Sequence, residues 1–343
     1  MNRSIKKVAV LGSGVMGSAI ACHFANIGCK VLLLDIAPQA LTEEEKAKGL
    51  TLDHKTVKNR MVQSSFDRSI KSSPGPIYSK KFVSRISLGN FTDDFSKIKE
   101  YDWIIEVVVE NLDIKKKVYE QVEQHRTPGT LVTSNTSGIP IHLMAEGRSE
   151  DFKKHFAGTH FFNPPRYLKL FEVIPTPHTA PEVTKFLMHY GDLYLGKTSV
   201  LCKDTPAFIG NRVGVWGLLK VIDSMQKFDL NVDEIDKLTG PVIGRPKSAT
   251  FRTSDLVGLD TLVKVANNLY AGLPHDEGRE MFKLSEVVTK MEKNNWLGDK
   301  TGQGFYKKVK TPDGKSDIHT LDLKTLEYKP KAKAKFATLE TTK

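Results

Sequence analysis

A short stretch near the N-terminus decides the fold of this 343-residue chain: Val8-Ala9-Val10-Leu11-Gly12-Ser13-Gly14-Val15-Met16-Gly17-Ser18-Ala19-Ile20. Its apolar start, glycine-rich middle and helically spaced end predict a strand, a tight turn and a helix. Gly12 suits the turn, Gly14 a close backbone approach to a pyrophosphate, and Gly17 close packing of helix on strand. A dinucleotide is therefore expected at this helix N-terminus, in a loop that also includes Ser13, Val15 and Met16.

The segment that follows supports this interpretation. A second apolar run at residues 30–34 ends in Asp35, at the distance where an acid binds the ribose of a dinucleotide. The acid would repel a 2′-phosphate, which favours NAD over NADP. The alternative is an ordinary glycine-rich turn in an unrelated α/β protein.

Alternating segments along the first 200 residues predict an α/β fold. Helical stretches separate short apolar segments, and this alternation is typical of a doubly wound, Rossmann-like, mostly parallel sheet. We expect this domain to span residues 1–200. The further strand candidates are residues 83–88, 103–109, 130–133, 158–162, 170–174 and 199–202.

The pattern of predicted elements changes after residue 200. Residues 201–308 read as helices with Gly and Pro between them, at 211–228, 232–239, 260–269 and 282–294, and predict a second, all-α domain. A turn signal at Thr311-Pro312-Asp313-Gly314 and a basic low-complexity run predict a hairpin-like segment and a linker-like tail over residues 309–343.

A basic insertion interrupts the nucleotide-binding domain at about residues 42–82. Thr42-Glu43-Glu44-Glu45 forms a capping box, and helix is expected from there to about Ile70. Residues 46–85 hold ten lysines and arginines against two acids, in a chain of net charge +11. Aromatic platforms for nucleic acid are missing, so a phosphorylated small molecule fits better. A solvated helical face without a ligand is the alternative.

Composition excludes several classes of protein. Three scattered cysteines suit a reducing cytoplasm and form neither a disulfide framework nor a metal site. The basic residues near the N-terminus precede the glycine-rich strand itself and not a signal peptide. No apolar run reaches the roughly 20 residues needed to span a bilayer. We expect a cytoplasmic protein without a metal.

One histidine and one glutamate suggest acid–base chemistry. His160 lies near the carboxyl end of a predicted parallel strand, where open α/β sheets bind ligands. Glu172 lies twelve residues later in an apolar strand, and a buried acid needs a partner. A return strand would bring the two together, and the carboxylate would fix the imidazole tautomer and strengthen it as a base. For His160 alone, a core histidine is the alternative.

Two more polar segments are candidates. Residues 133–138, which include Ser137, follow another strand and reach the same edge, although the pattern also suits a helix cap. Residues 203–212 open the helical domain and bring Asn211 toward a cleft between the domains, or form only a domain-entry turn.

Over residues 5–308 the chain resembles the 3-hydroxyacyl-CoA dehydrogenase family. The resemblance rests on motifs in family order: residues 12–17, Glu106-Val107-Val108-Val109-Glu110-Asn111, Ser134-Asn135-Thr136-Ser137, His160-Phe161-Phe162-Asn163-Pro164, Phe208-Ile209-Gly210-Asn211-Arg212, Val257-Gly258-Leu259-Asp260 and Lys300-Thr301-Gly302-Gln303-Gly304-Phe305-Tyr306.

The resemblance implies NAD-dependent oxidation of (S)-3-hydroxyacyl-CoA to 3-ketoacyl-CoA in fatty-acid β-oxidation. It makes His160 the base for the 3-hydroxyl proton and Glu172 its orienting carboxylate, while Ser137 and Asn211 position substrate oxygens. Asp35 would bind the adenosine ribose. The family positions expected near the cofactor are Glu110, Lys115, Asn163 and Lys300.

The resemblance also implies binding partners. The basic insertion at about residues 42–82 would form an arm that binds CoA phosphates, with Lys58, Arg60 and Arg68 as candidates. A homodimer or pseudo-dimer would form through the helical domain. The chain is similar to the N-terminal part of multidomain β-oxidation proteins that have an enoyl-CoA hydratase portion. Basic segments at 165–167 and 244–252 depart from many relatives and leave the acyl-chain preference open.

Two other functions remain open from the sequence. One is an NAD-dependent β-hydroxyacid dehydrogenase of the kind that uses lysine as its base and needs no basic arm. The other is a non-catalytic NAD-binding relative of crystallin type, because a fold does not by itself imply turnover.

Overall fold

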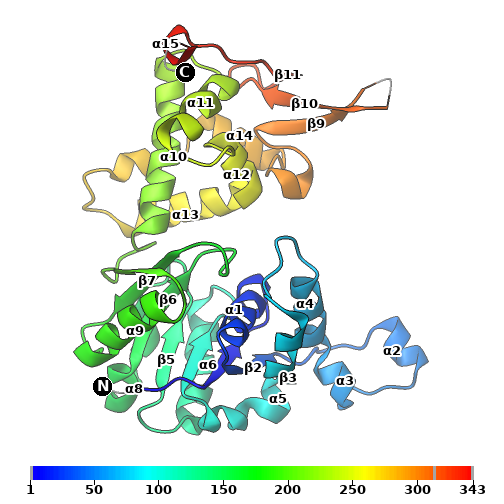
Figure 1. The fold of residues 1–343 in the computed structure, drawn as a ribbon, viewed down its shortest axis with the longest axis vertical. Coiled ribbons are helices and arrows are strands. Elements are labelled where there is room, and N and C mark those ends of the chain that lie inside the picture. The colour runs from blue at the N-terminus through cyan, green and yellow to red at the C-terminus, as the bar shows by residue number, and fades with distance from the viewer. Residues whose placement is uncertain (1–2, 312–313, 341–343) are drawn as a thin grey trace. The chain divides into compact units, whose positions relative to one another are not determined.

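The computed structural model describes residues 3–311 and 314–340. The chain divides into two compact units, residues 1–208 and 209–343, where we expected a boundary near residue 200 (Figure 1). The difference has a packing cause. Cys202 and Phe208 are buried in a core of the first unit, and the Asp204 carboxylate binds backbone N–H groups there, so the segment after residue 200 stays with that unit.

The first unit is built on an eight-stranded sheet in the order β3-β2-β1-β4-β5-β6-β7-β8. Neighbouring strands are parallel except β6 and β7, which are antiparallel. This confirms the predicted Rossmann-like, mostly parallel sheet. The strands are β1 (Lys7–Leu11), β2 (Lys30–Asp35), β3 (Ile86–Asn90), β4 (Trp103–Glu106), β5 (Leu131–Ser134), β6 (Phe156–Phe161), β7 (Leu170–Pro175) and β8 (Thr198–Leu201).

Helices cover both faces of this sheet because successive residues of the buried strands point to opposite sides. In β1, Val8 and Val10 pack on one core, and Ala9 and Leu11 on the other. The first core is completed by α1 (Val15–Asn26), α4 (Arg60–Ile70) and α9 (Pro181–Leu193). The second is completed by α6 (Leu112–His125), α7 (Ile141–Ala145) and α8 (Glu150–Lys154). Between β3 and β4, α5 (Phe91–Asp94) leads into a 3-10 helix at Phe95–Glu100.

Two predicted strands have different limits in the structure. The strand expected at 83–88 begins only at Ile86, because Val83 lies in a 3-10 helix, Lys80–Arg85. The strand expected at 103–109 ends at Glu106. There the Glu106 carboxylate accepts a hydrogen bond of 2.7 Å from the Val108 backbone N–H, which turns the chain out of the sheet.

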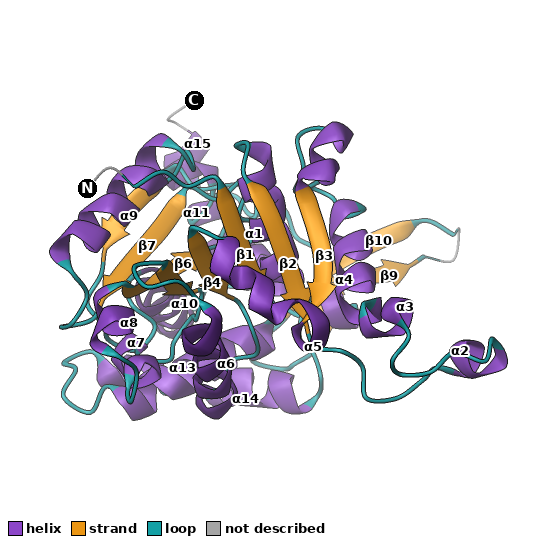
Figure 2. Ribbon diagram, turned by 90° about the horizontal axis from the view of Figure 1, so that it is seen from below, coloured by secondary structure: helices purple, strands orange, loops and turns teal. Residues whose placement is uncertain are grey.

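The arm is three short helices and not the one helical stretch expected up to Ile70. They are α2 (Glu43–Ala47), α3 (Lys55–Lys58) and α4. The predicted capping box is present at Thr42 and Glu45, but the chain leaves α2 at Gly49, whose φ of +67° ends helical geometry. Helix α2 buries no residue and lies at the outer end of the arm (Figure 2). Helix α4 packs against α1, because Val62 and Phe66 lie in the same core as residues of α1.

The second unit begins with helices, as expected. They are α10 (Gly210–Lys227), α11 (Val232–Leu238), α12 (Phe251–Val257), α13 (Leu259–Gly272) and α14 (Glu286–Lys293), with 3-10 helices at Pro241–Ile243, Arg279–Phe282 and Asp299–Thr301. The helix expected at 282–294 starts later, because the Ser285 side chain caps α14 by accepting from the Val288 N–H.

A three-stranded antiparallel sheet follows these helices, where we expected a hairpin and a linker. It consists of β9 (Tyr306–Lys310), β10 (Ser316–Leu321) and β11 (Tyr328–Pro330), and α15 (Ala337–Glu340) comes after it. The sheet is fixed to α11, because the Asp233 carboxylate accepts from the Thr320 hydroxyl and from the Ala332 backbone N–H. In the turn predicted at 311–314, Pro312 and Asp313 lie outside the described residues, as do residues 341–343.

Among residues 3–311 and 314–340, no helix combines the length and the apolar character that crossing a bilayer requires.

Candidate active site

His160 and Glu172 meet across the antiparallel pair of strands. They are directly opposite in the register of β6 and β7, and His160 Nδ1 lies 2.7 Å from Glu172 Oε2. Both side chains are buried, Glu172 completely. A carboxylate accepting from Nδ1–H leaves the lone pair of the ring on Nε2, which points away from Glu172 and can accept a proton.

Ser137 lies on the other side of the imidazole. Its hydroxyl oxygen is 3.2 Å from His160 Nε2, and it comes from the loop that follows β5. Ser137, His160 and Glu172 therefore lie at one edge of the sheet, where β5 and β6 end and the antiparallel β7 begins. The arrangement can hold a substrate hydroxyl or carbonyl oxygen within hydrogen-bonding distance of both Ser137 Oγ and His160 Nε2.

Two aromatic rings enclose the imidazole. The Phe162 ring centroid lies 4.4 Å from that of His160, and the Phe208 centroid lies at 5.8 Å. They limit rotation of the imidazole and keep water from its faces, which strengthens the hydrogen bond to Glu172.

Glu110 fixes the loop that contains Ser137. Its Oε1 accepts from the Ser137 N–H at 3.0 Å, the Gly138 N–H at 3.1 Å and the Thr136 hydroxyl at 2.6 Å. Burial by itself would raise the pKa of Glu110, but the Lys115 ammonium and these hydrogen bonds outweigh it and hold the pKa below its usual range. Glu110 is therefore ionised and binds the loop strongly.

Beneath this loop lies a buried polar cluster that sequence reasoning missed. Glu106 is fully buried and accepts from the Lys115 ammonium, the Tyr119 hydroxyl and the Ser134 hydroxyl, each at 2.7 Å. Lys115 also pairs with Glu110 at 3.4 Å, and only 1% of it is exposed. We expected Lys115 beside the cofactor, whereas here its ammonium is bound by two carboxylates. The sequence signal that could have revealed this cluster is an acid, Glu106, at the end of a buried strand.

The glycine loop has the geometry that a pyrophosphate needs. Gly12 has a φ of +105°, and a Cβ there would lie 2.6 Å from the Val107 carbonyl oxygen. A Cβ at Gly17 would lie 1.8 Å from the Gly12 carbonyl oxygen, so helix and strand touch. Around Gly14 no atom lies within 4 Å of such a position, which leaves open space for a ligand against the backbone.

Asp35 at the end of β2 closes the other side of this loop. Its Oδ2 accepts from the Ser13 backbone N–H at 2.8 Å and also from the Ser13 hydroxyl. The carboxylate therefore both orders the loop and lies beside it, where the ribose of a bound dinucleotide is expected. These residues fit NAD, because a negative charge here opposes a 2′-phosphate.

Family comparisons agree with this geometry. Residues 7–205 match the NAD-binding domain of 3-hydroxyacyl-CoA dehydrogenase, and residues 208–308 match its C-terminal domain. The chain belongs to the 3-hydroxyacyl-CoA dehydrogenase family. The family, the fold and NAD as the cofactor, all predicted from sequence, are thereby confirmed.

Two curated relatives and one solved structure illustrate the similarity. A probable 3-hydroxyacyl-CoA dehydrogenase of Bacillus subtilis is 53% identical over all 343 residues, which span 43% of the relative. A putative fatty acid oxidation complex trifunctional enzyme of Rickettsia prowazekii is 33% identical over 331 residues, 96% of this chain and 44% of that protein. The crystal structure of (S)-3-hydroxybutyryl-CoA dehydrogenase from Ralstonia eutropha has a TM-score of 0.68 at 26% identity, covering 88% of this chain and 98% of that one.

The remaining site residues that the family motifs predict are Asn163, Asn211 and Lys300. Asn163 is exposed just after β6. Asn211 and Lys300 belong to the second unit, where Asn211 lies in the first turn of α10 and the Lys300 ammonium pairs with Asp260. These contacts leave their predicted substrate and cofactor roles as family-based expectations.

The three arm residues differ in their partners. Lys58 pairs with Asp93 at 2.9 Å and with Asp53 at 3.7 Å, and Arg60 pairs with Glu45 and donates to the Ala40 carbonyl. Arg68 is exposed and has no carboxylate partner among residues 3–311 and 314–340. Lys58 and Arg60 thus already have their charge compensated, while Arg68 does not.

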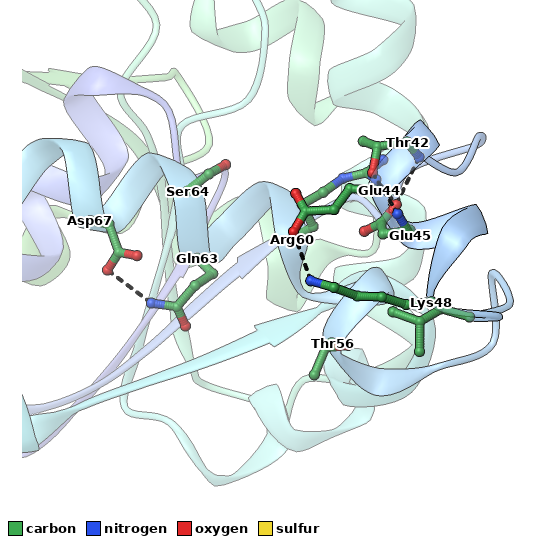
Figure 3. Close-up of a pocket in the computed structure, with 10 residues that line it drawn as sticks. Thr42, Glu44, Glu45, Lys48, Thr56, Arg60, Gln63, Ser64 and Asp67 are labelled. Carbon is green, nitrogen blue, oxygen red and sulfur yellow. Dashed lines mark hydrogen bonds and ion pairs between the residues drawn. The ribbon is translucent and has the colours of Figure 1, made fainter.

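A cavity of about 430 Å³ lies on the arm and not at the carboxyl edge of the sheet (Figure 3). Arg60 and Lys48 line it together with Glu44, Glu45 and Asp67. Within the cavity Lys48 pairs with Glu44 at 2.7 Å. Acids outnumber the bases here, so the cavity suits a phosphate poorly.

Proposed function

We propose that this chain catalyses the NAD-dependent interconversion of (S)-3-hydroxyacyl-CoA and 3-ketoacyl-CoA in fatty-acid β-oxidation. The observation that carries the proposal is the line Ser137–His160–Glu172 at the carboxyl edge of a sheet whose first strand opens into an NAD-binding loop. An acid–base pair beside a hydride acceptor is the set of groups that alcohol oxidation requires.

The chemistry follows from the positions of these side chains. The substrate 3-hydroxyl binds beside Ser137 Oγ and His160 Nε2, within hydrogen-bonding distance of both, and gives its proton to Nε2. Glu172 holds the imidazole in the tautomer that can accept the proton and stabilises the imidazolium that results. NAD, which residues 12–17 and Asp35 would hold, would supply the acceptor for the hydride that leaves C3. In reduction, His160 returns the proton to the developing alkoxide.

Other site residues in this proposal follow from the family motifs. Asn211 positions a substrate oxygen, and Asn163 and Lys300 contribute to the cofactor site together with Asp35 and Glu110. Lys115 supports Glu110 from below. Its contact with Glu110 at 3.4 Å makes this indirect role the one that its surroundings favour.

For the CoA phosphates we propose Arg68 over Lys58 and Arg60. The support is the charge balance of the arm, because a guanidinium without a carboxylate partner binds a phosphate without first losing an ion pair. Arg68 follows Phe66 on α4, which packs against the first core, so its backbone position is well fixed.

We further propose a cytoplasmic enzyme that dimerises through its second unit. The dimer is supported by exposed apolar side chains on and next to α10. Val213 and Trp216 lie on this helix, and Phe228 follows it directly. Sedimentation velocity over a range of concentrations tests this, and a monomer at every concentration would contradict it.

A steady-state scan of 3-ketoacyl-CoA chain lengths with NADH and with NADPH tests the function. We expect turnover of CoA thioesters with NADH and a strong preference for NADH over NADPH. Turnover of free 3-hydroxyacids without CoA would favour another β-hydroxyacid dehydrogenase. NADH binding without turnover of any substrate would favour a non-catalytic relative.

A further inference from the structure

The loop between β6 and β7 joins the strand of His160 to the arm. It starts at Phe162, two residues after His160, and ends at Lys169. Within it the backbone N–H groups of Tyr167 and Leu168 donate to the Pro164 carbonyl, so the loop is a closed turn. Two of its side chains, those of Arg166 and Tyr167, contact residues 75–78, the segment by which the arm returns to the sheet.

Arg166 makes most of the contacts with this return segment. Its Nη1 donates to the Gly75 carbonyl at 2.7 Å and to the Ile77 carbonyl at 3.2 Å. Its guanidinium lies 4.1 Å from the centroid of the Tyr78 ring. The Tyr167 hydroxyl adds a bond of 3.1 Å to the Gly75 carbonyl. A planar guanidinium that stacks and donates twice fixes both position and orientation.

A buried lysine holds the loop from its other side. The Lys197 ammonium donates to the carbonyls of Pro165 and Leu168, on both sides of Arg166. Burial lowers the pKa of Lys197 to about 8, so the amine still has its proton at pH 7 and can donate to both carbonyls. The loop is therefore rigid, and Arg166 extends from a fixed base.

The return segment is also fixed to the helix that follows the glycine loop. Asn26, the last residue of α1, donates from its amide to the Pro76 carbonyl at 2.9 Å and accepts from the Tyr78 N–H at 2.8 Å. Residues 75–78 thus lie between α1 on one side and the His160 loop on the other. The position of the arm relative to both is set by hydrogen bonds between their side chains and the backbone of this segment.

We propose that Arg166 is a positioning residue that sets the distance between the CoA-binding arm and His160. The inference rests on the proposed function. A thioester that binds the arm by its CoA end reaches His160 only if that distance is correct. The binding energy of the CoA part therefore depends on the contacts that Arg166 makes with residues 75–78. Arg166 itself touches only the return segment.

Kinetics of R166A with two thioesters tests this. For acetoacetyl-CoA we expect KM to rise about tenfold, with kcat and the KM for NADH within about twofold of the wild type. For acetoacetyl-N-acetylcysteamine, which lacks the part that the arm binds, kcat/KM stays within about twofold. R166K, which keeps the charge but cannot stack and donate twice, behaves like R166A.

R85A is the matched control. Arg85 also stacks on an aromatic ring, Phe82 at 4.1 Å, and donates to a backbone carbonyl, that of Ala25 at 2.6 Å, but it does not contact the His160 loop. We expect its KM for acetoacetyl-CoA to be unchanged. Y167F, which loses one hydroxyl, gives a smaller rise than R166A and serves if R166A does not fold.

Several results would overturn the inference. An unchanged KM in folded R166A, equal losses with both thioesters, equal losses in R85A, or a wild-type KM in R166K would each contradict it. Failure of the proposed function is separate, because then the wild type itself turns over neither thioester.

Discussion

His160 and Glu172 are opposite residues of an antiparallel strand pair, with His160 Nδ1 2.7 Å from Glu172 Oε2. Residues opposite one another in such a pair place their side chains on the same face of the sheet. The geometry of the acid–base pair is therefore fixed by backbone hydrogen bonds and not by a loop. It needs no rearrangement to reach the orientation that proton transfer requires.

Replacing His160 by Gln should remove the base. We expect kcat for acetoacetyl-CoA reduction to fall about 10²- to 10⁴-fold, because that is the usual contribution of a positioned acid–base group. NADH affinity, measured by fluorescence titration, should stay within about twofold. The exposed His189 on α9 provides a matched control, H189Q, which should be fully active. Near-normal turnover of H160Q would exclude His160 as the base.

Replacing Glu172 by Gln should separate activity from stability. The amide donates to Nδ1 and favours the tautomer with a proton on Nε2, so kcat should fall about 10²-fold or more. The melting temperature should stay equal or rise, since a fully buried carboxylate is replaced by a neutral group of the same shape. Unchanged kcat would show that the carboxylate does not orient the base.

Ser134, the last residue of β5, and Ser137, in the loop that follows it, provide a matched pair of hydroxyls. S137A removes the group 3.2 Å from His160 Nε2 and should lower kcat/KM about tenfold without changing the melting temperature. S134A leaves buried Glu106 short of one donor and should cost about 1–3 kcal/mol of stability while most of the activity remains. Thermal melts and steady-state kinetics on both variants check this, and the reverse pattern would contradict it.

Lys115 should act through folding. K115M leaves fully buried Glu106 without its cation, which should cost about 3–5 kcal/mol in the free energy of unfolding. Urea denaturation measures the loss, and the double variant E106Q/K115M should regain part of it. If K115M is as stable as the wild type but binds NADH more weakly, Lys115 contacts the cofactor directly.

Asp255 should make the stability of the second unit depend on pH. It accepts from the backbone N–H groups of Phe305 at 2.9 Å and Tyr306 at 2.8 Å, and burial raises its pKa from 3.8 to about 6. The folded state then binds the proton more tightly than the unfolded state. The contribution of this group is complete below pH 3.8 and is lost as pH rises through 6.

The comparison with D255N isolates this effect from other carboxylates. The melting temperature of the wild type minus that of D255N should be largest near pH 3.5 and should shrink toward pH 7.5. A constant difference over that range would show that Asp255 is ionised in the folded state throughout.

Histidines show the limit of sequence reasoning at the site. His23 on α1 is as buried as His160, but its Nε2 meets only the Leu195 carbonyl, and burial lowers its pKa to about 4. Burial does not distinguish the two residues. His160 could be singled out because it lies near the carboxyl end of a predicted strand and an acid follows on the expected return strand.

By itself, the sequence determined the features that depend on neighbours along the chain. The turn at Gly12, the helix of residues 15–26, the acid at the end of β2 and the capping box at Thr42 follow from local sterics, spacing and hydrogen bonding. The alternation of strands and helices then favoured a doubly wound sheet, because helices on both sides bury both faces of a parallel sheet.

Only the tertiary structure decided which charges meet. Glu106, Lys115 and Ser134 come from a strand, a helix and another strand, and Arg166 reaches carbonyl groups about 90 residues earlier in the chain. The sequence predicted Lys58 and Arg60 as candidates for binding phosphate, and the fold pairs them with Asp93 and Glu45. Ion pairs and buried polar clusters depend on distances of a few ångströms between distant segments, and no local pattern encodes those distances.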